Sequence, residues 1–161
     1  MIVEPCCFIR QLDGMLRGKE TTVNFFTNGD VPFASFLEYL IYAAPGGNVF
    51  LSLVRVEEST LREIVRLMKD IDQLTILSSG EDRALIRKYL HPFIGSKVTV
   101  CEDRISFRCV TVSNGCRSFV MHGSIMQSCS YSMQLFSVSS SPDTYNEIMT
   151  VFSSKKRMKS V

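Results

Sequence analysis

Residues 48–77, NVFLSLVRVEESTLREIVRLMKDIDQLTIL, place a helical pattern between two apolar runs. Residues 48–54 form a short, mostly apolar run, which is typical of a strand buried on both faces. Residues 57–71 carry apolar side chains at steps of three and four, the period of one helix face: Leu61, Ile64, Val65 and Met68. Residues 74–77 are apolar again and predict the next strand. A strand, a helix and a strand in this order favour parallel strands covered by helices.

Similar units flank this stretch on both sides. Toward the N-terminus, residues 21–26 suit a strand, and Asp30 with Pro32 predicts the start of a helix that Pro45 ends. The apolar side chains of this helix fall on one face: Phe33, Phe36, Leu37, Leu40, Ile41 and Ala44. Toward the C-terminus, residues 79–82 read as a Ser-x-x-Asp cap. They open a helix with a further apolar face: Ile86, Tyr89, Leu90 and Phe93.

The second half of the chain consists mainly of strands. Four runs are predicted as successive strands: residues 98–101, 105–112, 117–122 and 133–138. Residues 113–115 (SNG) predict a hairpin turn between two of these strands. Ser141 with Pro142 then opens a last helix, whose apolar side chains share one face: Tyr145, Ile148, Met149 and Phe152.

The composition is that of one globular domain. The chain has 161 residues, of which 45% are hydrophobic and 21% charged, and no repeat or flexible linker divides it, so we predict a single domain over residues 1–161. The formal net charge of +2 is too small to indicate a nucleic-acid binder by itself. Residues 154–161 hold the basic cluster Lys155, Lys156, Arg157 and Lys159, predicted as a frayed tail, with a phosphate-contacting tail as the alternative.

Two kinds of segment are not expected in this chain. The N-terminus lacks the pattern of a signal peptide, and no apolar run approaches the roughly 20 residues that span a bilayer. We therefore expect a cytoplasmic protein that makes no membrane contact.

The cysteines do not predict a metal site. In the cytoplasm the six cysteines are expected to be reduced thiols, and Cys6 next to Cys7 could form only a strained disulfide. Five residues superficially suggest a zinc set: Cys101, Cys109, Cys116, His122 and Cys129. No two of them are separated by the about two to four residues that let one turn present two ligands. We predict no metal and no cofactor.

The order of these elements resembles a single phospholipase D-type domain. The most similar part is residues 121–152, where a strand ends in Gly123 and Ser124, a polar stretch follows, and a second strand ends before a helix start at Pro142 and Asp143. The resemblance covers almost the entire chain. It implies an α/β fold with a phospholipase D-like mixed sheet flanked by helices on both faces.

The signature of that family is His-x-Lys, four residues and Asp, with a Gly-Ser-x-Asn-like element one strand later. Residues 105–115 (ISFRCVTVSNG) occupy the place of the motif, with Ser106 at the histidine, Arg108 at the lysine and Ser113 at the aspartate. Met126 falls at the asparagine. In the family, one histidine attacks phosphorus and a second histidine protonates the leaving oxygen. The resemblance with these replacements implies a pseudoenzyme without catalytic residues.

Arg108 is the one signature position that keeps its charge. A retained arginine can still bind phosphate oxygens in a fork, although a guanidinium paired with a carboxylate is an equal alternative. The remnant anion site implied by the resemblance consists of Ser106, Arg108, Ser113, Gly123 and Ser124. His122 is a further candidate, either as a displaced nucleophile or as a structural or solvated histidine.

Two functions remain open at this point. The first is a catalytically inactive domain that binds nucleic acid or another phosphate-bearing ligand. The second is a protein-interaction or assembly module without a ligand. By analogy with single-motif members of the family, we expect a homodimer. No catalytic motif supports an active hydrolase with an unrelated set of residues.

Overall fold

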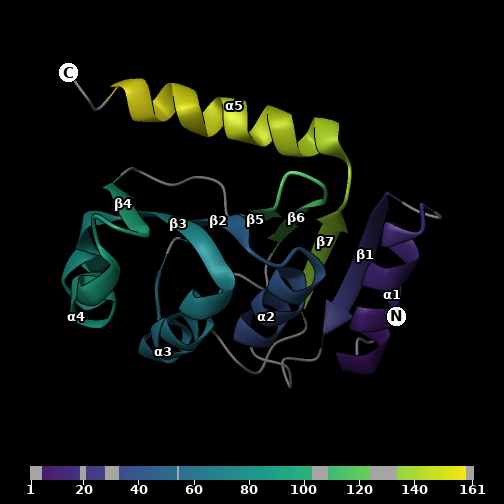
Figure 1. Cartoon of the computed structure of the whole chain (residues 1–161), viewed down its shortest axis with the longest axis horizontal. Helices are drawn as coiled ribbons and strands as arrows, with labels where there is room; N and C mark the ends of the chain where they lie inside the picture. The colour runs from purple at the N-terminus through teal and green to yellow at the C-terminus, as the bar shows by residue number, and fades with distance from the viewer. Residues whose placement is uncertain are drawn as a thin grey trace.

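A computed structural model of the chain describes residues 5–18, 21–27, 33–53, 55–102, 109–123 and 134–158. Within these residues, seven strands form one sheet in the order β1-β7-β6-β5-β2-β3-β4 (Figure 1). β2, β3 and β4 are parallel to one another, and every other neighbouring pair is antiparallel. The strands are β1 (Thr22–Thr27), β2 (Gly47–Ser52), β3 (Ile71–Ser78), β4 (Val98–Glu102), β5 (Cys109–Ser113), β6 (Ser118–Gly123) and β7 (Gln134–Ser139).

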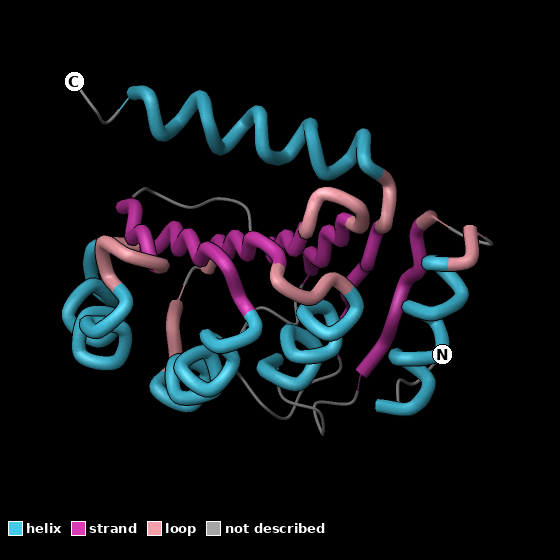
Figure 2. The backbone as a smooth tube through the Cα atoms, in the orientation of Figure 1, coloured by secondary structure: helices cyan, strands magenta, loops and turns pink. Residues whose placement is uncertain are grey.

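Helices cover both faces of this sheet. Four of them lie on one side, and the long α5 crosses the other side alone (Figures 1 and 2). The helices are α1 (Pro5–Leu16), α2 (Phe33–Ala43), α3 (Glu58–Leu67), α4 (Arg83–Leu90) and α5 (Pro142–Met158), with short 3-10 turns η1 (Met68–Asp70), η2 (Gly80–Asp82) and η3 (His91–Phe93). The predicted α/β class, the mixed sheet and the helices on both faces are confirmed. That residues 1–161 form a single domain stays a prediction.

The core is divided unequally between the two faces. The larger cluster lies between the sheet and α1 to α4, and its large, fully buried side chains include Phe25, Phe36, Phe136, Leu40 and Leu51. The smaller cluster lies under α5 and consists of Phe50, Leu77, Cys109 and Phe152. The Phe50 and Phe152 rings stack with centroids 4.3 Å apart. Because apolar burial is the main favourable contribution to folding, the face of the sheet covered by α1 to α4 contributes most of the stability.

Most predicted elements are present, but the strand pairing differs from the prediction. The largely parallel sheet expected from the first half is wrong for β1, which pairs antiparallel with β7, as in Phe25 opposite Phe136. The two rings stack with centroids 5.2 Å apart, which stabilises this antiparallel pair at the edge of the sheet. α1 was not predicted at all, although Leu12 and Met15 bury in the larger cluster.

Two local predictions are corrected as well. Ser79 does not cap α4, since the chain first forms η2, and the Asp82 carboxylate instead accepts a hydrogen bond from the Val56 N–H at 3.0 Å. The frayed tail over residues 154–161 is wrong for residues 154–158, because α5 continues to Met158. Residues 159–161 lie outside the described residues. None of the described helices has the length and apolar character needed to cross a membrane.

Candidate functional site

One cross-strand row of side chains runs over the whole sheet near the carboxyl ends of the parallel strands. Each of its members is paired in register with the next across a pair of strands. Paired residues point to the same side of a sheet, so the whole row lies on the face that α5 crosses. We call these residues the carboxyl-end row: Asn24, Ser137, His122, Cys109, Ser52, Leu77 and Cys101.

Cys109 and His122 are direct partners in the carboxyl-end row. A thiol beside an imidazole can form a catalytic pair only if the thiol ionises. The Cys109 side chain is fully buried, and burial raises the pKa of its thiol to about 12. His122 is half-buried at the end of β6. Cys109 therefore stays protonated at neutral pH and acts as a packing residue rather than a nucleophile.

The same row separates the residues of the zinc set. Ser52 and Leu77 lie between Cys109 and Cys101, and three strand spacings amount to about 14 Å. Cys116 is exposed at the tip of the β5–β6 hairpin, and Cys129 lies outside the described residues. No group of three His, Cys, Asp or Glu side chains suited to a metal ion is found in the described part of the chain.

Gly123 ends β6 in a conformation that requires glycine. Its φ of +139° is one that L side chains rarely adopt. A Cβ at this position would lie 2.5 Å from the Leu135 carbonyl oxygen and 2.6 Å from the Phe136 Cα. The absence of a side chain at Gly123 therefore lets β7 approach β6 at the carboxyl end of the sheet.

The structure does not bring Ser113 together with His122 and Gly123. Ser113 pairs with Ser118 at the hairpin end of β5, about 13 Å along the strand from Cys109. Its hydroxyl lies 2.9 Å from the Ser118 Oγ and accepts a hydrogen bond from the Gly115 N–H at 3.3 Å. These bonds give Ser113 a role in the turn, so its assignment to an anion site is not supported. The remaining candidates, Ser106, Arg108 and Ser124, lie outside the described residues, as does Met126.

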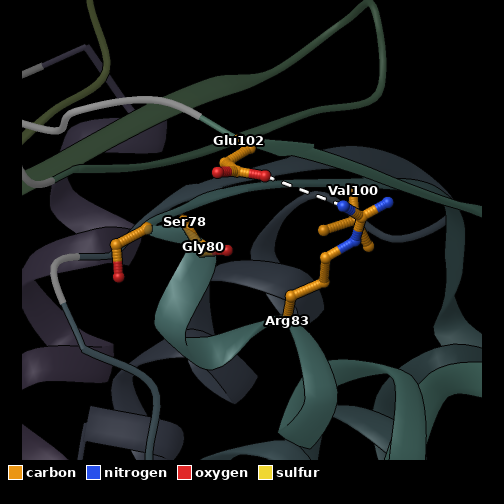
Figure 3. A pocket seen from close by; sticks show the side chains of 6 residues that line it. Ser78, Gly80, Arg83, Val100 and Glu102 are labelled. Carbon is orange, nitrogen blue, oxygen red and sulfur yellow. Dashed lines mark ion pairs between the residues drawn. The ribbon is translucent and has the colours of Figure 1, made fainter.

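A pocket that was not predicted from the sequence opens at the carboxyl ends of β3 and β4. It has a volume of about 190 Å³ and is lined by Ser78, Ser79, Gly80, Arg83, Val100 and Glu102 (Figure 3). Glu102 points toward Arg83, with 3.8 Å between Oε2 and Nη1. A Cβ on Gly80 would lie 2.6 Å from the Glu102 Oε1. An anionic ligand in this pocket would need the Arg83 guanidinium, which already pairs with the Glu102 carboxylate.

The general rule that ligands bind beyond the carboxyl ends of parallel strands could have indicated this pocket. Val100 and Glu102 lie on the same side of β4 as the buried Val98, so the pocket faces α4. The carboxyl-end row faces α5 instead. The two features share one end of the sheet but lie on opposite faces.

Comparisons with known proteins show the fold only. No family model matches the chain, and no curated protein matches it. Among solved structures, the chain is similar to TrmBL2, described as an archaeal chromatin protein whose structure shows a novel mode of DNA binding. The TM-score is 0.59 at 7% identity, over 92% of this chain and 58% of that one. The chain thus shares a fold with a little over half of TrmBL2.

Proposed function

We propose that this chain is a catalytically inactive phospholipase D-like domain that binds nucleic acid, or another phosphate-bearing ligand, at the carboxyl end of its sheet. The observation that carries the proposal is the pairing of Cys109 with His122. The signature positions Ser106 and Arg108 come immediately before Cys109 in the sequence. We assign Arg108 to the ligand contact from this position in the sequence and from the resemblance to the phospholipase D-type motif.

The fold comparison supports nucleic acid as the ligand class. A chromatin protein described as DNA-binding shares this fold over 92% of the chain. Guanidinium groups bind phosphate oxygens in a fork, and phosphate contacts supply most of the affinity for a nucleic-acid backbone. Arg108 is the residue that we assign to such a contact.

Inactivity follows from the side chains at the signature positions. Ser106 cannot form a phosphohistidine, and the buried Cys109 thiol is protonated at neutral pH. We expect no hydrolysis of a generic phosphodiester such as bis(p-nitrophenyl) phosphate above the buffer rate. Hydrolysis that disappears in Arg108→Ala or His122→Ala would contradict the assignment as a pseudoenzyme.

A binding titration tests the ligand class directly. Fluorescence anisotropy of labelled single-stranded and duplex DNA, repeated at several salt concentrations, measures affinity and its salt dependence. Arg108→Ala should weaken binding roughly tenfold and reduce the salt slope by about one unit, because one phosphate contact is lost. Arg87→Ala is the matched control, since Arg87 is an exposed arginine on α4. Equal losses in the two variants, or no salt-dependent binding by the wild type, would contradict the proposal.

The alternative is a protein-interaction or assembly module, which the charge pairing favours. Two exposed arginines on the face covered by α1 to α4 already pair with carboxylates, with N to O distances of 2.8 to 2.9 Å: Arg62 with Glu58, and Arg66 with Glu38 and Glu63. Such paired cations offer little to a phosphate backbone. A protein that binds no nucleic acid but gains mass with concentration in sedimentation would support this alternative.

A further inference from the structure

The pocket at the carboxyl ends of β3 and β4 contains a buried hydroxyl group without a partner. Ser78 is the cross-strand partner of Glu102 and is 2% exposed. Its hydroxyl makes no hydrogen bond to any residue that the structure describes. Every completely enclosed polar side-chain atom in the described part of the chain does have a hydrogen-bond partner. The Ser78 hydroxyl therefore reaches the open space of the pocket, where a ligand can bind it.

Two opposite charges lie at the outer side of the same pocket. The Arg83 and Glu102 side chains are 56% and 58% exposed, and one contact of 3.8 Å joins them (Figure 3). By comparison, the ion pairs that Arg66 makes from α3 are 2.9 and 2.8 Å long. An exposed pair at the longer distance contributes little to stability. Both groups can therefore bind a ligand that carries charges of its own.

The turn that forms one wall of the pocket is held by hydrogen bonds. The Asp82 N–H donates to the Ser79 carbonyl at 3.3 Å, and the Asp82 carboxylate accepts from the Val56 N–H at 3.0 Å. Gly80 lies in this turn, and a Cβ there would be 2.6 Å from the Glu102 Oε1. The absence of a side chain at Gly80 lets the carboxylate lie against η2. This wall of the pocket is therefore formed before a ligand binds.

The size and the charges of the pocket favour a small zwitterion. Its volume of about 190 Å³ is below the about 300–1,000 Å³ of sites for drug-sized ligands, which argues against a nucleotide. Arg83 attracts a simple anion that Glu102 repels, and the reverse holds for a simple cation. A ligand with a carboxylate and an ammonium on the same carbon satisfies both charges at once.

We propose that this pocket binds a free α-amino acid with a polar side chain. Its carboxylate binds the Arg83 guanidinium, its ammonium binds the Glu102 carboxylate, and its side chain hydrogen-bonds the Ser78 hydroxyl. The pocket faces α4, whereas the carboxyl-end row faces α5. Amino-acid binding here is therefore independent of the proposed nucleic-acid function and extends beyond it.

A ligand series tests the need for both charges. L-Serine is compared with β-hydroxypropionate, which lacks the ammonium, and with ethanolamine, which lacks the carboxylate. Binding to the whole chain is followed by proton–nitrogen correlation NMR, in which L-serine should cause saturable shifts of the Gly80 and Glu102 amide signals. The two partial ligands should bind at least about tenfold more weakly, because each loses a charge-assisted hydrogen bond. Equal affinity for β-hydroxypropionate would show a simple anion site and overturn the proposal.

Single variants test each contact separately. Arg83→Ala and Glu102→Ala should each weaken L-serine binding at least about tenfold, and both side chains are exposed, so the fold should be retained. Ser78→Ala should weaken L-serine binding about fivefold, because one neutral hydrogen bond is lost. The same variant should leave L-alanine binding unchanged, since L-alanine has no hydroxyl group. Arg87→Ala is the matched control, an exposed arginine on the same helix, and should bind L-serine as the wild type does.

The outcomes are distinguishable from those that test nucleic-acid binding. If L-serine, L-threonine and L-asparagine cause no saturable shifts at millimolar concentrations, the proposal for this pocket fails, and DNA binding is unaffected by that result. Equal losses in Arg83→Ala and Arg87→Ala would show a general effect of charge and would also overturn it. Conversely, a chain that binds no DNA but binds L-serine through Arg83 retains this site while the proposed nucleic-acid function fails.

Discussion

Replacing Gly123 with alanine should lower the free energy of unfolding by about 4 kcal/mol, and two separate costs produce this value. The φ of +139° is strained for any residue with a Cβ, which costs about 1–3 kcal/mol. The new Cβ would also lie 2.5 Å from the Leu135 carbonyl oxygen and 2.6 Å from the Phe136 Cα. Both atoms belong to the backbone of β7, so no side-chain rotation removes the overlap, and overpacking of this kind costs about 1–3 kcal/mol.

Urea unfolding followed by circular dichroism measures this loss. With a slope of about 2 kcal/mol per molar urea, the midpoint should fall by about 2 M. Gly115→Ala is the matched control, because Gly115 also has a positive φ, +85°, and no described atom lies within 4 Å of its added Cβ. The control should lose only the conformational cost of about 1–2 kcal/mol.

The comparison of the two glycines decides which physical cause operates. Equal losses for Gly123→Ala and Gly115→Ala would show that the close approach of β7 contributes nothing. A Gly123→Ala variant within about 0.5 kcal/mol of the wild type, the ordinary range of surface substitutions, would refute the strain and the contact together.

Four further outcomes are expected. Phe152→Ala should lower the free energy of unfolding in urea by about 3 kcal/mol, because it removes the ring that stacks on Phe50 and anchors α5. Val151 is 54% exposed, so Val151→Ala should change the free energy of unfolding by less than about 0.5 kcal/mol. In the native protein, iodoacetamide should modify the exposed Cys116 before the buried Cys109, as read by peptide mass spectrometry; equal rates would contradict the burial of Cys109. Burial raises the pKa of the Cys109 thiol to about 12, so above a pH of about 8.5 the folded state keeps a proton that the unfolded chain releases. The free energy of unfolding should therefore fall as pH rises above about 8.5. Cys109→Ala should remove this part of the pH dependence. Sedimentation should show a homodimer, and a monomer mass at all concentrations would contradict the analogy on which that expectation rests.

Elements with a strong local period were predictable from the sequence. Phe36, Leu37, Leu40 and Ile41 were predicted on one helix face and are all buried. α1 was not predictable in this way, because Gly14 interrupts its pattern and short helices form mainly through tertiary packing. The antiparallel pairing of β1 with β7 has no local signal either, since its partners are more than a hundred residues apart in the chain.

The candidate site was predictable in part. The predicted hairpin turn at residues 113–115 already implies that Ser113 lies at the turn end of β5, because hairpin partners are fixed by counting outward from the turn. The same counting pairs Cys109 with His122, as the structure shows. Grouping residues by a family motif placed Ser113 with Gly123, although counting along the strands separates them. The pocket at Glu102 was missed because its residues come from two strands and a helix start, which no short motif contains.

The two faces of the sheet differ in the chemistry of their side chains, and this difference sets how each face is covered. On the face covered by α1 to α4, the side chains that point toward the helices are nearly all apolar and are buried against them. On the α5 side, the row next to the carboxyl-end row is rich in hydroxyl groups, with Thr22, Ser139, Thr111, Thr75 and Thr99 among its members. Burying hydroxyl groups costs free energy unless they are hydrogen-bonded, which is consistent with the small apolar cluster under the single helix α5. Stability on this face therefore depends on a few apolar side chains, the stacked rings of Phe50 and Phe152 among them.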